Sequence, residues 1–246
     1  MSLFRPALRR LALVASLALL VSPASAQDAG DVRFPEQVQQ GSLVIGKVPA
    51  GSRVQYRDRA LRVSGYGTVA LGVGRDETGP VQLDITRADG SRQSASIAIT
   101  TRDWPVERVN GVPPATVNPP PAIAERIRRE QAQVTEARVR DDDRVDFGNG
   151  FIRPVEGRIS GRFGRARAYN GQPGAPHSGM DIAAPTGTPV KAPAAGIVTF
   201  AGPDLYLTGG TLLLDHGYGI SSNFLHLSRI DAKVCLLYTS PSPRDS

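Results

Sequence analysis

The sequence predicts a mainly β protein: an immunoglobulin-like sandwich, a helical connector and a second, β-rich domain. The first observation is compositional. The 246 residues include 26 glycines and 20 prolines but only 6% aromatic residues, which favours turn-rich β structure over a helical bundle. The second is a series of short segments with alternating polarity between residues 41 and 103. The third is one stretch with helical spacing, residues 122–140, followed by a glycine-rich segment.

Residues 1–26 have the layout of a secretory signal peptide. Three arginines within the first ten residues precede an apolar run at 11–21, and Ala24-Ser25-Ala26 supplies the small residues of a cleavage site. The apolar run is too short to span a bilayer comfortably, so a retained membrane anchor is the less favoured alternative. We therefore expect an exported protein, periplasmic or extracellular, without stable membrane insertion after signal cleavage.

Residues 27–40 are polar and predict a lead-in without regular structure. From residue 41 on, apolar and polar residues alternate with a period of two. Asp89-Gly90 predicts a two-residue hairpin turn, because both positions tolerate positive φ. Short alternating segments predict an immunoglobulin-like β domain over 41–103, which has no histidine and is expected to act as a spacer or a binding module. The expected strands are 43–46, 54–56, 61–63, 69–73, 81–85 and 95–99.

Residues 104–147 predict a proline-rich and helical connector. Proline fixes φ and resists both helix and sheet, so the run that ends in Pro119-Pro120-Pro121 indicates a stiff segment. Ala122 to Arg140 then predicts a helix, with Ile123, Ile127 and Val134 at helical spacing among charged residues.

The candidate chemistry lies in the second domain, residues 148–234, which holds all three histidines of the chain. His177 and Asp181 stand four residues apart, and a neutral imidazole with a carboxylate is a suitable pair of zinc ligands. Pro176, Gly179 and Pro185 favour a strand-and-turn setting over a helix. Taken alone this spacing is a weak signal, because it also arises by chance.

The blocks around this pair are more specific as an ordered set. They are GRISGRFG (157–164), HSGMDIAAPTGTPV (177–190), AGIV (195–198), LDHGYG (214–219) and FLHLS (224–228). In this order they resemble the lysostaphin-type zinc endopeptidases, which cut peptide cross-links in bacterial cell walls. The resemblance covers residues 151–234.

The resemblance implies a role for several of these residues. It makes His177 and Asp181 two of three zinc ligands, and it makes His226 a catalytic histidine that moves protons or hydrogen-bonds the tetrahedral oxyanion. His216 is expected to be structural. The family's third ligand is the second histidine of a later His-x-His motif, which this chain lacks. The third zinc ligand is therefore expected to be absent from this chain; recruitment of His216 or His226 in its place is an alternative that we do not favour.

Residues 235–246 continue no earlier pattern and resemble a translated sequencing adapter. We therefore expect the natural reading frame to be interrupted after Val234 and the peptidase domain to be incomplete, the alternative being a natural tail. The single cysteine, Cys235, lies in this segment, so we expect no disulfide and no thiol chemistry. When residues 1–26 and 235–246 are left out, the formal charge of +6 falls to half that value, which removes the main support for a nucleic-acid partner.

The resemblance implies a zinc-dependent metalloendopeptidase that uses Zn²⁺ to hydrolyse peptide bonds of peptidoglycan. The chain as it stands is expected to bind zinc poorly and to be inactive or nearly so. Two other classes stay open: a non-catalytic activator or scaffold of other wall hydrolases, and a wall-binding module anchored by the sandwich. A serine nucleophile is disfavoured because no Gly-x-Ser-x-Gly elbow occurs. Glycosidase chemistry is disfavoured because nothing brings Glu156, Asp204 and Asp231 together.

Overall fold

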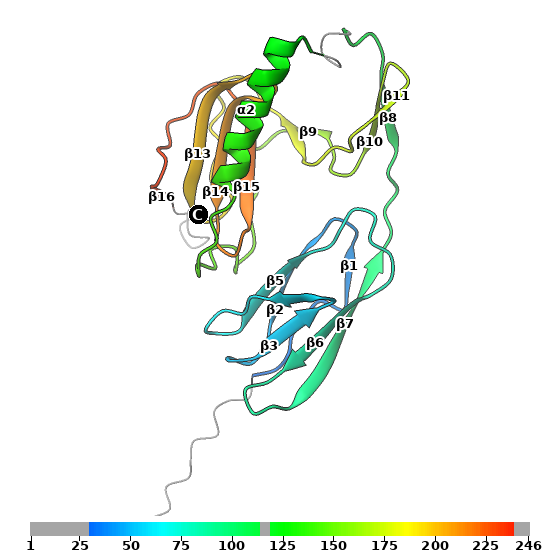
Figure 1. Ribbon diagram of the computed structural model, residues 1–246, viewed down its shortest axis with the longest axis vertical. Helices are drawn as coiled ribbons and strands as arrows, with labels where there is room; N and C mark the ends of the chain where they lie inside the picture. Colours follow the sequence, from blue (N-terminus) through cyan, green and yellow to red (C-terminus); the bar gives the residue numbers. More distant parts are fainter. Residues whose placement is uncertain (1–29, 114–118, 239–246) are drawn as a thin grey trace, which may run out of the picture.

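The structure, a computed structural model, describes residues 30–113 and 119–238. The signal peptide predicted for residues 1–26 lies outside these ranges. The described part of the chain is mainly β with one helix, as predicted, and forms two bodies that follow each other along the long axis of the molecule (Figure 1). Among the described residues, no helix is long and apolar enough to cross a membrane.

The N-terminal domain consists of two sheets that share one core. The larger sheet has the order β1-β7-β6-β3-β4, with β1 parallel to β7, and the smaller sheet pairs β2 with β5. Alternation along the strands turns Val44, Val69, Leu83 and Ile97 inward, each with at most 1% of its surface exposed. Burying one such side chain contributes about 1.5–3 kcal/mol. The strands are β1 Gln37–Gln39, β2 Leu43–Lys47, β3 Arg53–Tyr56, β4 Arg59–Leu61, β5 Thr68–Gly72, β6 Val81–Thr86 and β7 Arg92–Thr100.

Three local expectations about this domain differ from the structure. Strand β1 lies inside the segment expected to lack regular structure, because its main chain pairs with β7 and Val38 packs on the core. The strand expected at 61–63 lies two residues earlier, as β4. The β6–β7 hairpin turns where expected, but through the loop 88–90. Only Gly90 has positive φ there, while the Asp89 carboxylate accepts a hydrogen bond from the Ser91 amide at 2.8 Å.

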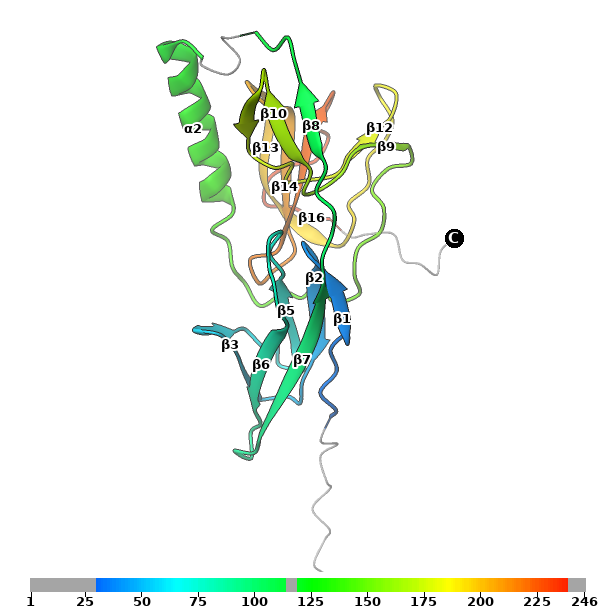
Figure 2. The same ribbon diagram turned by 90° about the vertical axis from the view of Figure 1, so that its right-hand side faces the viewer.

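The connector contains helix α2, Pro121–Ala137, and strand β8, Val106–Val109. The helix was expected at residues 122–140. It begins one residue earlier than expected and ends three residues earlier than expected. None of its residues is buried. It meets the second domain through Arg126, which donates to the Asp204 carbonyl at 2.7 Å, and Glu130, which accepts from the Tyr206 amide at 2.8 Å. Strand β8 was not expected from the sequence, and it pairs in parallel with β10 of the second domain (Figure 2).

The second domain is built around the sheet β15-β14-β13-β16, beside a hairpin sheet β11-β10-β8 and the pair β12-β9. Val198, Leu212 and Leu214 form its core with partly buried Phe224 and Leu227 around them. Leu237 and Tyr238, in the segment that resembles a translated sequencing adapter, pair with the start of β13. The strands are β9 Arg158–Gly161, β10 Ala166–Tyr169, β11 Gln172–Gly174, β12 Asp181–Ala183, β13 Gly196–Leu205, β14 Gly209–Asp215, β15 Ser221–Leu227 and β16 Leu237–Tyr238.

Aromatic and cationic groups join the two domains where β7 leads into the connector. The ring of Trp104 meets that of Phe163 edge to face, with centroids 6.0 Å apart. Arg75 lies 4.9 Å over the Trp104 ring and donates from Nε to the Gly164 carbonyl at 2.7 Å. Trp104 Nε1 donates to the Gln40 side chain at 3.2 Å. Each cation–π contact of this kind contributes about 0.5–1 kcal/mol at an exposed site.

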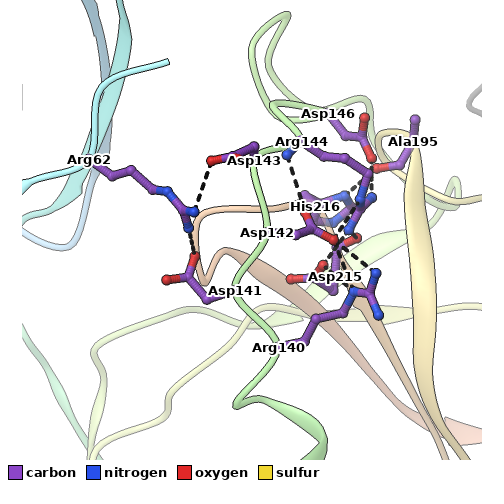
Figure 3. Close-up of polar contacts among 10 residues, drawn as sticks. All are labelled: Arg62, Arg140, Asp141, Asp142, Asp143, Arg144, Asp146, Ala195, Asp215 and His216. Atoms are coloured by element: carbon purple, nitrogen blue, oxygen red, sulfur yellow. Dashed lines mark hydrogen bonds and ion pairs between the residues drawn. The ribbon is translucent and has the colours of Figure 1, made fainter. Parts of the chain in front are cut away.

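A second contact between the domains involves acidic residues after the helix. Figure 3 shows the Arg62 guanidinium, which comes from the N-terminal domain, between the carboxylates of Asp141 and Asp143. The same guanidinium lies 5.0 Å from the ring centroid of Tyr218 in the second domain. Asp141 and Asp143, which follow helix α2 in the sequence, therefore connect the second domain to the N-terminal domain.

Candidate functional site

The structure brings the two predicted zinc ligands together. His177 follows β11 and Asp181 begins β12, so the strand-and-turn setting expected from the sequence is correct. The Nε2 atom of His177 lies 3.1 Å from Oδ1 of Asp181. The histidine side chain is only 12% exposed, whereas the aspartate side chain is 51% exposed and open to solvent.

Main-chain hydrogen bonds fix the position of His177. Its amide donates to the Arg165 carbonyl at 2.9 Å, and its carbonyl accepts from the Gly164 amide at 2.8 Å. Its Nδ1 lies 3.2 Å from the Arg162 carbonyl, which accepts the proton when Nδ1 carries it. That tautomer leaves the lone pair of Nε2 on the side of Asp181, which is how metal-binding histidines are commonly oriented.

Gly161 supplies the space in which the pair lies. It is the register partner of Asp181 in the β9–β12 ladder, where the register shifts between Asp181 and Ile182. A Cβ atom on Gly161 would lie 2.2 Å from Oδ2 of Asp181 and 2.9 Å from Cε1 of His177. A side chain at this position would displace the carboxylate. The sequence showed this glycine within a block but gave no sign of its role.

The pair fits two positions of a zinc site. Imidazole nitrogen and carboxylate oxygen are both zinc donors, and a catalytic site needs three protein ligands with one open position. Within residues 30–113 and 119–238, no group of three or more His, Cys, Asp or Glu side chains could hold a metal ion. Two candidate donors thus lie together in the described residues, and their role as zinc ligands stays a prediction.

Comparison with known proteins identifies the domain that holds the pair. The model of peptidase family M23 matches residues 175–235. A Pseudomonas aeruginosa crystal structure assigned to peptidase M23 is 28% identical, with a TM-score of 0.56 over 82% of this chain and 78% of that chain. Residues 175–235 of the second domain thus match an M23 peptidase domain, and we call the second domain the M23 domain below. The resemblance to the lysostaphin-type family is thereby confirmed.

Two curated relatives are longer than this chain. The cell division protein DipM of Caulobacter vibrioides is 28% identical over 154 residues, which are 62% of this chain and 24% of DipM. The DD-carboxypeptidase/endopeptidase Mpg of Neisseria meningitidis is 42% identical over 52 residues, which are 21% of this chain and 12% of Mpg. The chain thus spans a quarter or less of the length of these relatives.

The other two histidines of the M23 domain have different environments. His226 lies in β15, exposed, with φ of +59°, and its amide donates to the Thr208 carbonyl at 2.9 Å. His216 is fully buried at the end of β14 (Figure 3). Its Nδ1 lies 2.5 Å from the Ala195 carbonyl and its Nε2 lies 2.8 Å from Oγ of Ser222, so both ring nitrogens have partners. Burial lowers the pKa of His216, and these features are those of a structural histidine.

Neither histidine joins the His177–Asp181 pair in a metal-binding group within the described residues. His216 is held by its two hydrogen bonds, so it is not a substitute ligand. His226 lies on the strand β15 of the main sheet, whereas Asp181 lies on β12 of a separate two-stranded sheet. The catalytic role implied for His226 stays a prediction.

Two charged residues beside the pair were missed by the sequence analysis. The Nη2 atom of Arg167, on β10, lies 4.0 Å from Oδ2 of Asp181. The Nε atom of the same guanidinium lies 3.6 Å from Oε2 of Glu107 on β8. The parallel pairing of β8 with β10 makes Glu107 and Arg167 register partners, although they are far apart in the sequence. Only the unexpected strand β8 brings Glu107 to the site.

Proposed function

We propose that the protein is a zinc-dependent metalloendopeptidase that hydrolyses peptide bonds of bacterial peptidoglycan. The observation that carries the proposal is the 3.1 Å approach of His177 Nε2 to Asp181 Oδ1 within a segment that matches peptidase family M23. The name of the relative Mpg, a carboxypeptidase and endopeptidase, supports peptide hydrolysis as the reaction. The predicted signal peptide supports export to the compartment where peptidoglycan lies.

His177 and Asp181 are the residues that would hold Zn²⁺. Zinc held there would supply Lewis-acid chemistry, which would lower the pKa of a bound water molecule and polarise the scissile carbonyl. The chain's own groups prepare the ligands: the Arg162 carbonyl orients the imidazole, and Gly161 leaves room for the carboxylate. His226 is proposed to donate or accept a proton, since an imidazole can do either near neutral pH.

We expect the chain as it stands to hold zinc weakly and to hydrolyse peptidoglycan little or not at all. The sequence has no His-x-His motif, and the proposed site has two donor side chains, whereas a catalytic zinc ion needs three protein ligands. Peptidase competence is therefore proposed to depend on a third ligand from outside the described residues.

A non-catalytic activator or scaffold of other cell-wall hydrolases is the second candidate. The two-ligand site favours it, because a fold of this family without a complete metal site can still bind a partner. The relative DipM is named as a cell division protein and not as a hydrolase, which is compatible with such a role.

Zinc affinity and peptide release separate these functions. The affinity of the chain for Zn²⁺ is measured by competition with a chromophoric chelator, for the unsubstituted protein and for His177→Ala and Asp181→Ala. Both variants should lose the affinity, and Asp231→Ala, which removes an exposed carboxylate of the same domain, should keep it. Equal zinc affinity in all four proteins would show that the pair is not the metal site.

Release of peptides from purified peptidoglycan is then measured with zinc in excess. Hydrolysis that both site variants abolish would establish the peptidase and would contradict the expected inactivity of this chain. Stimulation of a second wall hydrolase that survives His177→Ala would establish the activator.

A further inference from the structure

Arg167 lies between two carboxylates that come from different parts of the chain. Its Nε atom is 3.6 Å from Oε2 of Glu107, and its Nη2 atom is 4.0 Å from Oδ2 of Asp181. The Arg167 side chain is 27% exposed, so solvent screens these charges only in part. The guanidinium is near enough to either carboxylate to form a hydrogen-bonded pair after a small movement.

Arg167 approaches the Asp181 carboxylate at the oxygen that does not face His177. Oδ1 of Asp181 faces His177 at 3.1 Å, and Oδ2 is the oxygen nearer to Arg167. A guanidinium that closed on this carboxylate in a bidentate pair would occupy the oxygens that a metal ion needs. At the observed 4.0 Å it is at the outer limit of an ion pair.

Glu107 is the second carboxylate near this guanidinium. It is the register partner of Arg167 in the β8–β10 ladder, so the backbone holds the two side chains beside each other. Asn170 strengthens the same junction, because its side chain accepts from the Val112 amide at 3.1 Å and donates to the Val112 carbonyl at 2.8 Å. The contact of β8 with the hairpin is thus held by the main-chain ladder and by Asn170 just beyond its C-terminal end.

We propose that Glu107 is a positioning residue that holds the Arg167 guanidinium away from Asp181, so that the Asp181 carboxylate is free to bind a divalent cation beside His177. The inference rests on the proposed function for the identity of that cation as zinc. Because Glu107 lies on the strand that leaves the N-terminal domain, the connector contributes to the site as well as joining the domains.

The first test needs no metal. The Arg167 Nε–H resonance is followed by NMR in the zinc-free full chain, and Asp181→Asn is introduced with and without Glu107→Gln. With Glu107 present, Asp181→Asn should change the resonance little. In the Glu107→Gln background, Asp181→Asn should change the Arg167 resonance several-fold more, since Arg167 then pairs with Asp181. Equal changes in the two backgrounds would overturn the proposal.

The second test is a double-substitution cycle on affinity for Zn²⁺ alone. Glu107→Gln should weaken zinc binding about tenfold, the lower end of the range for residues that support metal ligands. Adding Arg167→Gln should restore the affinity, because the competing cation is gone. Weakening in the double variant equal to that in Glu107→Gln would also overturn the proposal.

A matched control variant and a metal-free measurement separate the positioning role of Glu107 from the proposed zinc function. Glu77→Gln removes a similar partner from Arg57 within the N-terminal domain and should leave zinc affinity unchanged. If the unsubstituted chain binds no zinc, the proposed metal function is wrong. The zinc-free NMR comparison still decides whether Glu107 restrains Arg167.

Discussion

Gly161 and Asp181 approach each other so closely that a methyl group on the glycine would lie 2.2 Å from the aspartate Oδ2. The contact arises because the two residues are opposite each other in the β9–β12 ladder. Glycine is needed at this position for space and not for its conformational freedom, since Gly161 is not among the residues with positive φ.

Gly161→Ala should therefore damage the candidate metal site more than the fold. The new methyl group forces the Asp181 carboxylate away from His177, and we expect the affinity for Zn²⁺ to fall at least about tenfold. Chelator competition measures the affinity, and urea unfolding measures stability. Gly179→Ala is the matched control, because a Cβ atom there meets nothing within 4 Å. Unchanged zinc affinity in Gly161→Ala would count against the proposed ligand geometry.

Arg144→Leu should destabilise the M23 domain by about 3 kcal/mol, because it removes the nearer of the two guanidinium groups that pair with the buried Asp215 carboxylate, the other being that of Arg140 at 3.5 Å. The Asp215 side chain is only 4% exposed, and Arg144 makes hydrogen-bonded ion pairs with it and with Asp146 (Figure 3). Denaturant unfolding measures the loss. The control Arg229→Leu removes an exposed pair with Asp231 and should cost less than about 1 kcal/mol. A similar small loss in both variants would show that the buried pair contributes little.

The stability of the M23 domain should fall as the pH drops below about 6.5. Burial lowers the pKa of His216, while its hydrogen bond with the Ala195 carbonyl partly opposes this. The unfolded chain then takes up a proton at a higher pH than the folded chain does. The contribution of His216 to the free energy of unfolding is fully present above the pKa that this histidine has in the unfolded chain. It decreases on acidification until the histidine of the folded chain is protonated.

Urea unfolding between pH 7.5 and pH 5 measures this dependence. His216→Gln should lack the component that belongs to the imidazole, so its profile should be flatter in this window. Burial raises the pKa of Asp215, which has the opposite effect on stability, but an aspartate titrates mainly at lower pH. Identical profiles for the two proteins would contradict the assignment.

Trp104→Ala should loosen the contact between the two domains without unfolding either. It removes the edge-to-face contact with Phe163 and the stacking of Arg75, which together are worth about 1–2 kcal/mol. The expected result is a larger radius of gyration in small-angle scattering and faster proteolysis within the connector. Tyr66→Ala, at a side chain that is largely exposed, is the control. An unchanged radius of gyration would show that other contacts, such as Arg62 with Asp141, suffice to hold the domains.

The parts of the fold that the sequence predicted are those with a local signal. Alternating apolar residues gave the strands around Val44 and Leu83, because these side chains enter a core whichever strand lies beside them. Helix α2 was predicted from helical spacing after a proline, and it begins one residue before the expected start. Strands β1 and β8 were missed because their extended form depends on main-chain pairing with β7 and β10.

The sequence by itself determined that the protein is mainly β and, through an ordered set of motifs, which family its second domain resembles; it also singled out His177 and Asp181 as a pair. Only the tertiary structure decided that the two side chains meet at 3.1 Å, that Gly161 makes room for them, and that Glu107 and Arg167 lie next to them. The physical reason is that ligand types and strand periods are encoded by neighbouring residues. Close approach and charge pairing depend instead on which strands the fold brings together, and nothing in the local sequence around residue 107 indicates a partner at residue 167.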